Sequence, residues 1–188
     1  MNPPAPSLPI YTVGHSTRPA ADFLALLAEN EIALLTDVRR FPASRRHPQF
    51  SRQALEESLR ENGIDYLHEP DLGGRRAPRP DSPNTAWRVA AFRGYADHME
   101  SPGFQAALAR LIANGASRPT VILCAEALPW RCHRRLIADA LVARGIPVVD
   151  ILAPGKVEPH ILNPDARPLP DGRLVYPAGG DEQGRLDL

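Results

Sequence analysis

The chain has 188 residues, and its 22 basic and 22 acidic side chains cancel. This length suits one domain with its own hydrophobic core, and the balanced charge excludes a global field that draws a protein onto nucleic acid or an anionic membrane. With two cysteines, no hydrophobic signal region and no long apolar span, the sequence predicts a cytoplasmic protein without a membrane partner.

Strands and helices are predicted to alternate along the chain. Short runs of aliphatic and β-branched residues indicate strands, and apolar residues at helical spacing indicate helices. In chain order we expect a strand at 10–14, a helix at 19–30, a strand at 32–38, a helix at 51–60, a strand at 64–70, helices at 85–99 and 101–115, a strand from 120, a helix that ends at 145, and a strand at 147–152.

Hydroxyl side chains mark two of the expected helix starts. Ser51 is expected to cap one helix, and Ser16 or Thr17 another, because a hydroxyl accepts a hydrogen bond from a free N–H of the first turn. The segments 40–50 and 72–84 contain prolines and show no periodicity, so we expect loops there.

Alternating strands and helices imply parallel strand pairing through right-handed crossovers. The predicted fold is therefore a layered α/β domain, with a mostly parallel sheet and helices on both faces. We expect a flexible N-terminal tail at 1–9 and a single domain at 10–163. A proline-punctuated tail follows at 164–188, with 174–177 as a candidate edge strand.

Polar side chains gather at the carboxyl ends of the predicted strands. At or just beyond these ends lie His15, Ser16, Asp37, Arg39, Cys124 and Glu126. In open α/β sheets ligands bind beyond the carboxyl ends of the strands, where helix N-termini offer free N–H groups and a positive dipole end. The sequence therefore predicts one shared site at this edge of the sheet.

Six sequence segments, in a fixed order, together span nearly the whole predicted domain and resemble a known family. They are VGHST at 13–17, DVRRFPAS at 37–44, the segment at 50–55, YLHEPDLGGRR at 66–76, FRGYADHM at 92–99 and CAEALPWRCHR at 124–134. This set resembles the bacterial and archaeal family catalogued as domain of unknown function 488. The resemblance implies a Rossmann-like α/β domain with a shared polar site, and it brings no established reaction or cofactor.

Cys124 is the candidate nucleophile. It leaves a strand toward a helix N-terminus, where the helix dipole and nearby cations favour a thiolate, and Cys132 is a candidate resolving partner. The spacing differs from the phosphatase signature, because position 130 is Trp and the following arginine is Arg131. The alternative is that Cys124 is a small buried residue at a strand end, which is common for free cysteine.

A second interpretation places a metal ion among Cys124, Glu126, Cys132 and His133, with His15 as a further ligand. Zinc accepts thiolate and imidazole ligands. However, the spacing is not a recognised zinc pattern, and adjacent residues on a helix point about 100° apart. We therefore assign no metal ligand, and separately satisfied polar side chains are the competing explanation.

A third interpretation treats the strand ends as a phosphate or nucleotide pocket. Arginine forks bind phosphate bidentately, and paired glycines let the backbone approach a ligand. The candidate anion-binding residues are Ser16, Arg39, Gly73, Gly74, Arg75, Arg131, His133 and Arg134. The chain has no GxGxxG and no Walker loop, so ordinary dinucleotide or ATP binding is not indicated. Structural ion pairs, such as Arg39 with Glu126, are the competing explanation.

The leading hypothesis is an enzyme, with hydrolase as the candidate class, that binds a phosphate-bearing small molecule or nucleic acid at this edge. Cys124 would be its nucleophile and Glu126 or Asp37 its acid or base. His15 is a candidate proton-transfer group because the reference pKa of histidine is near neutrality. The competing hypothesis is a non-catalytic nucleic-acid- or protein-binding module that uses the arginine-rich loops at 39–52 and 73–79.

Overall fold

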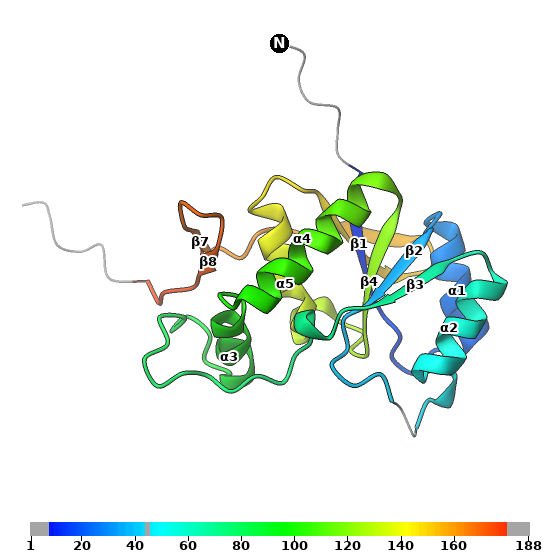
Figure 1. The fold of residues 1–188 in the computed structure, drawn as a ribbon, viewed down its shortest axis with the longest axis horizontal. Helices are drawn as coiled ribbons and strands as arrows, with labels where there is room; N and C mark the ends of the chain where they lie inside the picture. The colour runs from blue at the N-terminus through cyan, green and yellow to red at the C-terminus, as the bar shows by residue number, and fades with distance from the viewer. Residues whose placement is uncertain (1–7, 44–45, 180–188) are drawn as a thin grey trace, which may run out of the picture.

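The computed structural model describes residues 8–43 and 46–179, which form a six-stranded sheet covered by helices (Figure 1). The strands are β1 (Ile10–Gly14), β2 (Leu34–Asp37), β3 (Asp65–His68), β4 (Thr120–Cys124), β5 (Val148–Ala153) and β6 (Lys156–Pro159). Their order in the sheet is β3-β2-β4-β1-β5-β6, and every neighbouring pair is parallel except β5 with β6. The predicted mostly parallel α/β sheet is confirmed.

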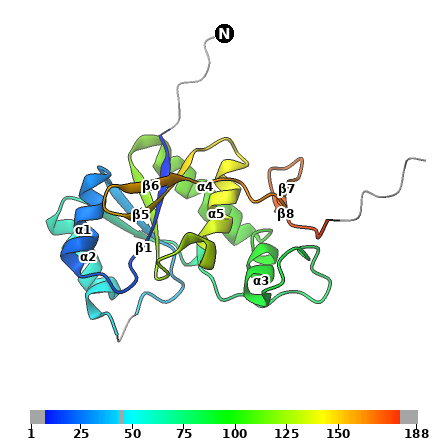
Figure 2. The same cartoon turned by 180° about the vertical axis from the view of Figure 1, so that it is seen from behind.

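Helices cover both faces of this sheet (Figure 2). α1 (Ala20–Glu29) and α2 (Arg52–Glu61) lie on one face, and α4 (Pro102–Ser117) and α5 (Arg134–Val142) lie on the other. The remaining helix, α3 (Ala90–His98), lies to the side of the sheet (Figure 2). In β4, Val121 and Leu123 belong to the hydrophobic cluster that includes α1 and α2, whereas Ile122 and Cys124 belong to the cluster that includes α4 and α5. Because successive strand side chains point to opposite faces, the Cys124 side chain lies on the α4 and α5 side.

Two of the helix starts follow directly from serine residues. The Ser51 hydroxyl accepts a hydrogen bond from the Ala54 N–H at 3.5 Å, and Ser101 accepts one from the Phe104 N–H at 3.2 Å. By contrast, α1 follows Pro19 and has no side-chain cap. The predicted capping role of Ser16 or Thr17 is therefore wrong.

The start of α3 also differs from the prediction, because the helix begins at Ala90 rather than near residue 85. The preceding segment packs against the C-terminal part of the chain. The Ala86 N–H donates to the Tyr176 carbonyl at 2.9 Å, and the Trp87 and Tyr176 ring centroids lie 5.5 Å apart. These tertiary contacts take the place of a helical turn.

The chain beyond residue 163 packs onto the domain. β7 (Arg167–Pro168) and β8 (Leu174–Val175) form a separate antiparallel pair, so the segment 174–177 does not extend the main sheet. Ala166, Leu174 and Tyr176 are buried in the cluster that includes α4 and α5. The predicted C-terminal tail is thus packed as far as these residues, while residues 1–7 and 180–188 lie outside the described part of the chain.

The half-buried His160 links this part of the chain to the sheet. His160 Nε2 lies 2.9 Å from Asp139 Oδ1 on α5, and Nδ1 lies 3.3 Å from Asp150 Oδ2 on β5. The Tyr176 hydroxyl donates to the other oxygen of Asp139 at 3.0 Å. Burial lowers the pKa of His160, but the hydrogen bonds to the two carboxylates outweigh burial and raise it to about 9. The imidazolium is therefore charged at neutral pH and links α5, β5 and the C-terminal segment.

Candidate functional site

The carboxyl ends of β1, β4 and β2 meet at one cavity of about 940 Å³. In the sheet Gly14 is paired with Cys124, and Asp37 is paired with Leu123. Just beyond the strands, the His15 N–H donates to the Cys124 carbonyl at 3.0 Å. Parallel pairing thus joins segments that are far apart in the sequence.

Most of the predicted site residues line this cavity. They are His15, Ser16, Arg39, Gly74, Arg75, Cys124, Glu126, Arg131 and His133. Asp37, Gly73 and Arg134 are buried and do not line it. The structure therefore separates the predicted set into residues that a ligand in the cavity can touch and residues that support them.

Asp37 belongs to the supporting group. Its two carboxylate oxygens accept hydrogen bonds from Arg39 Nε at 2.8 Å and from Arg39 Nη2 at 2.6 Å. The Tyr66 hydroxyl donates to Asp37 at 2.9 Å, and burial, followed by the Asp37 charge, raises the pKa of Tyr66. Because its oxygens are engaged and fully buried, Asp37 holds Arg39 in place. Arg39 is therefore paired with Asp37 and not with Glu126.

His15 is held as a neutral ring. Arg39 Nη1 lies 3.3 Å from His15 Nε2, and His15 Nδ1 lies 2.9 Å from the Ser16 carbonyl. A guanidinium only donates hydrogen bonds, so Nε2 accepts and Nδ1 carries the proton. Burial lowers the pKa of His15, and its ring stacks on Phe50 with centroids 4.3 Å apart. His15 therefore forms part of the cavity wall and orients Arg39.

The two cysteines lie beside His133. Its Nδ1 is 3.9 Å from Cys124 Sγ and 3.7 Å from Cys132 Sγ. The hydrogen bond from the Cys132 thiol lowers the pKa of Cys124 well below its usual value, and burial opposes this effect. His133 and the backbone N–H of Glu126 also favour the charged form of Cys124. These contacts favour the thiolate form at Cys124, and the hydrogen bond to Cys124, together with burial and the Cys124 charge, raises the pKa of Cys132.

Arg134 organises the loop that carries Cys124. Its side chain is 1% exposed, and its guanidinium donates to the carbonyls of Glu126 and Ala127, the latter at 2.7 Å. Gly14 packs against the same loop, where an added Cβ would lie 1.9 Å from the Glu126 carbonyl oxygen. Arg134 and Gly14 thus fix the path of the loop, and the Arg134 guanidinium is already used by backbone carbonyls.

The exposed part of the cavity wall is rich in arginine. Arg40, Arg46, Arg75 and Arg131 line it, and none of them forms an ion pair with a carboxylate of the described residues. Glu126 is the carboxylate that lines the cavity within the described ranges. This excess of positive charge favours an anionic ligand.

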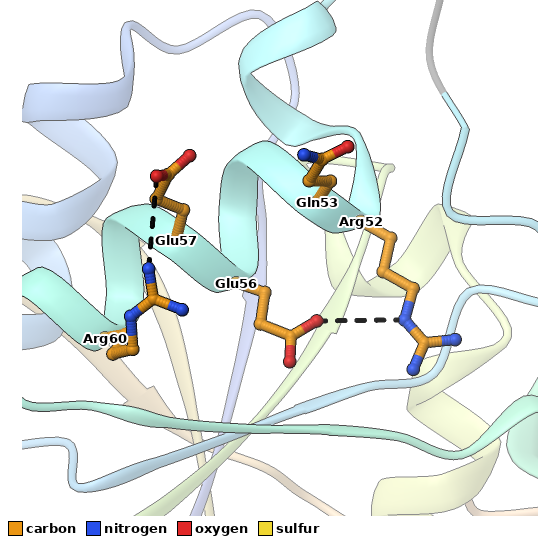
Figure 3. Close-up of a pocket in the computed structure, with 5 residues that line it drawn as sticks. All are labelled: Arg52, Gln53, Glu56, Glu57 and Arg60. Carbon is orange, nitrogen blue, oxygen red and sulfur yellow. Dashed lines mark ion pairs between the residues drawn. The ribbon is translucent and has the colours of Figure 1, made fainter.

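A second depression lies along α2 and has a different character (Figure 3). Arg52 lies 4.0 Å from Glu56 and Arg60 lies 3.9 Å from Glu57, and all four side chains are more than half exposed. Ion pairs at helical spacing on an exposed face are ordinary surface features. This depression therefore offers balanced charge and no buried reactive group.

Comparison with known families places the chain in a family of unknown function. The family described as domain of unknown function DUF488 matches residues 19–141. The chain belongs to this family. The match confirms the resemblance that the sequence segments indicate, and it covers Arg39, the Cys124 loop and most of α5. No curated protein and no solved structure matches the chain.

The DUF488 site contains residues that sequence reasoning did not assign to it. Arg40 and Arg46 appear in the sequence as a basic patch, but only the fold shows that they face the same cavity as Arg75. Phe41 and Phe92 form an apolar part of the wall, and the sequence gives no signal for this beyond their place in two of the family-like segments.

None of the helices in residues 8–43 and 46–179 has the length and apolar character needed to span a membrane.

Proposed function

We propose that this DUF488 protein binds a phosphate-bearing ligand in the cavity at the carboxyl ends of β1, β2 and β4, and that Cys124 attacks the bound ligand. The observation that carries the proposal is a wall of arginines that form no ion pair with a carboxylate of residues 8–43 and 46–179, around the buried sulfur of Cys124. Guanidinium groups bind phosphate oxygens through paired, charge-assisted hydrogen bonds. We assign anion binding to Arg75 and Arg131, because the guanidinium groups of Arg39 and Arg134 already donate hydrogen bonds to other protein groups.

The reaction class that suits these groups is hydrolysis of a phosphate ester or anhydride. The Cys124 sulfur forms a bond to phosphorus while the bond from phosphorus to the leaving oxygen breaks, and Glu126 acts as the general acid that transfers a proton to that oxygen. Water then attacks phosphorus, Glu126 takes the proton, and the sulfur–phosphorus bond breaks to regenerate the thiolate. Glu126 supports this role because it lines the cavity two residues beyond Cys124.

The alternative of a non-catalytic binding module for nucleic acid or protein receives less support from the geometry. Arg40 and Arg75 come from the two arginine-rich loops, and both line the cavity that contains Cys124. A module of that kind would use an extended basic surface to follow a phosphate backbone. Arginines gathered around one cavity favour a compact anionic group as the ligand.

Isothermal titration of the protein with inorganic pyrophosphate tests the proposal. We expect saturable binding that Arg75→Ala and Arg131→Ala each weaken about tenfold to a hundredfold, because each removes a charged hydrogen bond worth about 1.5–3 kcal/mol. Arg60→Ala is the matched control, since Arg60 is an exposed arginine on α2 outside the cavity. Equal binding by the Arg60 and Arg131 variants, or no binding by the unmodified protein, would contradict the proposal.

A further inference from the structure

Three soft metal-binding groups point to one place at the cavity wall. Cys124 Sγ, Cys132 Sγ and His133 Nδ1 all lie within 4.8 Å of one another. The nitrogen is 3.9 Å from the first sulfur and 3.7 Å from the second. His133 Nε2, in contrast, is buried without a hydrogen-bond partner among the described residues. The ring therefore meets its polar neighbours through Nδ1.

The sequence-based objection to a metal at this place does not apply to the observed backbone. That objection assumes that Cys132 and His133 are consecutive helical residues, with side chains about 100° apart. Cys132 is extended, with φ −125° and ψ 146°, and α5 begins only at Arg134. The two side chains are therefore free to face the same point, and the distances show that they do.

The separations are close to those that a single zinc ion requires. Zinc–sulfur bonds of about 2.3 Å and a zinc–nitrogen bond of about 2.0 Å, arranged tetrahedrally, place sulfur and nitrogen about 3.5 Å apart. Each observed sulfur–nitrogen distance exceeds this value by a few tenths of an ångström. Small side-chain rotations are enough to close that gap.

We propose that Cys124, Cys132 and His133 form a binding site for a soft d¹⁰ divalent cation such as Zn²⁺. The three ligands all line the cavity, so the fourth coordination position opens toward it and is available to water or an anion. Thiolate and imidazole ligands select such a metal over Mg²⁺ or Ca²⁺, which prefer oxygen. Gly74 packs against the ligand ring, where an added Cβ would lie 2.8 Å from His133 Nδ1.

This inference goes beyond the proposed function and describes a second form of the site. In the metal-free protein the Cys124 sulfur is available for attack, whereas a bound metal occupies its lone pair and masks it. Anion binding by the arginines and metal binding by the two cysteines and His133 can therefore be measured in separate experiments. Pyrophosphate titration in the presence of a chelator reports only the first.

Cobalt(II) is the probe for the metal site, because thiolate ligation produces charge-transfer bands and tetrahedral ligation produces intense visible bands. We expect the metal-free full-length protein to bind one equivalent of Co²⁺ with both sets of bands, and Zn²⁺ to displace it. Cys132→Ser and His133→Ala should each weaken Co²⁺ binding at least about tenfold. His98→Gln is the control, since His98 hydrogen-bonds to the Asp71 carbonyl and does not line the cavity.

Circular dichroism of each variant separates loss of a ligand from loss of the fold. If a variant fails to fold, protection of both thiols of the unmodified protein from iodoacetamide by Zn²⁺ provides an independent readout. Absence of thiolate charge-transfer bands in the unmodified protein would overturn the proposal. Unchanged cobalt spectra and affinity in a folded His133→Ala variant would overturn it as well.

Discussion

Replacing Arg134 by alanine tests whether Arg134 stabilises the fold rather than binding the ligand. The variant removes the charged donors from the carbonyls of Glu126 and Ala127. Each carbonyl left without a partner costs about 1–3 kcal/mol, so a value of about 1.5 kcal/mol for each gives a total near 3 kcal/mol. For a chain of this size 1 kcal/mol lowers the midpoint of thermal unfolding by about 2–4 °C. We therefore expect a decrease of about 6–12 °C.

Arg131→Ala is the matched comparison, because Arg131 is exposed and lines the cavity. Its free energy of unfolding should change by less than about 0.5 kcal/mol, as for most surface substitutions, while pyrophosphate affinity falls. Thermal denaturation followed by circular dichroism, together with pyrophosphate titration well below the midpoint, measures both quantities. An Arg134→Ala variant with an unchanged midpoint would refute the structural role assigned to Arg134.

Two further substitutions test the supports of the site and of the fold. Gly14→Ala should cost about 3 kcal/mol, because the added Cβ would lie 1.9 Å from the Glu126 carbonyl oxygen and the loop must move. An unchanged unfolding midpoint would contradict this. His160 has a folded pKa raised to about 9, above its usual 6.5, so its contribution of roughly 3 kcal/mol is fully present below pH 6.5 and is lost as the pH rises through 9. His160→Asn should therefore flatten the dependence of unfolding free energy on pH between 6.5 and 9, and urea titrations across this range check it; the same slope in both proteins would exclude the role.

The convergence of the site could be predicted from the sequence because it depends on the sheet alone. Near-continuous apolar runs predict buried parallel strands, and the carboxyl ends of parallel strands share one edge. His15, Arg39 and Cys124 directly follow or end such strands, and the structure places all three at the same cavity. The order of the strands is not needed for this prediction.

The division of labour among the arginines could not be predicted from the sequence. Arg131 and Arg134 lie three residues apart, yet Arg131 is exposed at the cavity and Arg134 is buried against backbone carbonyls. Which of them is buried depends on where α5 begins, and the loop before it has no periodicity that locates this start. The role of Arg39 depends in the same way on its ion pair with Asp37, and the sequence alone does not show which carboxylate Arg39 contacts.

The strand β6 and the packing of the C-terminal segment could not be predicted from the sequence, for related reasons. All residues of β6 are exposed, so this strand has no apolar alternation, and a turn with Gly155 at φ 65° joins it to β5. The C-terminal segment contains many prolines, which indicate a tail, but Tyr176 anchors it through a buried hydrogen bond to Asp139. Both features depend on tertiary contacts rather than on local patterns.

The central claim is that an anion binds in the cavity directly above a reactive Cys124. Alkylation by iodoacetamide, mapped to each cysteine by mass spectrometry in the presence of a chelator, tests this claim most directly. We predict that Cys124 reacts faster than Cys132 and that inorganic pyrophosphate slows its reaction in a saturable way, with protection lost in Arg131→Ala. A Cys124 that does not react, or one that reacts equally fast with and without pyrophosphate, would contradict it.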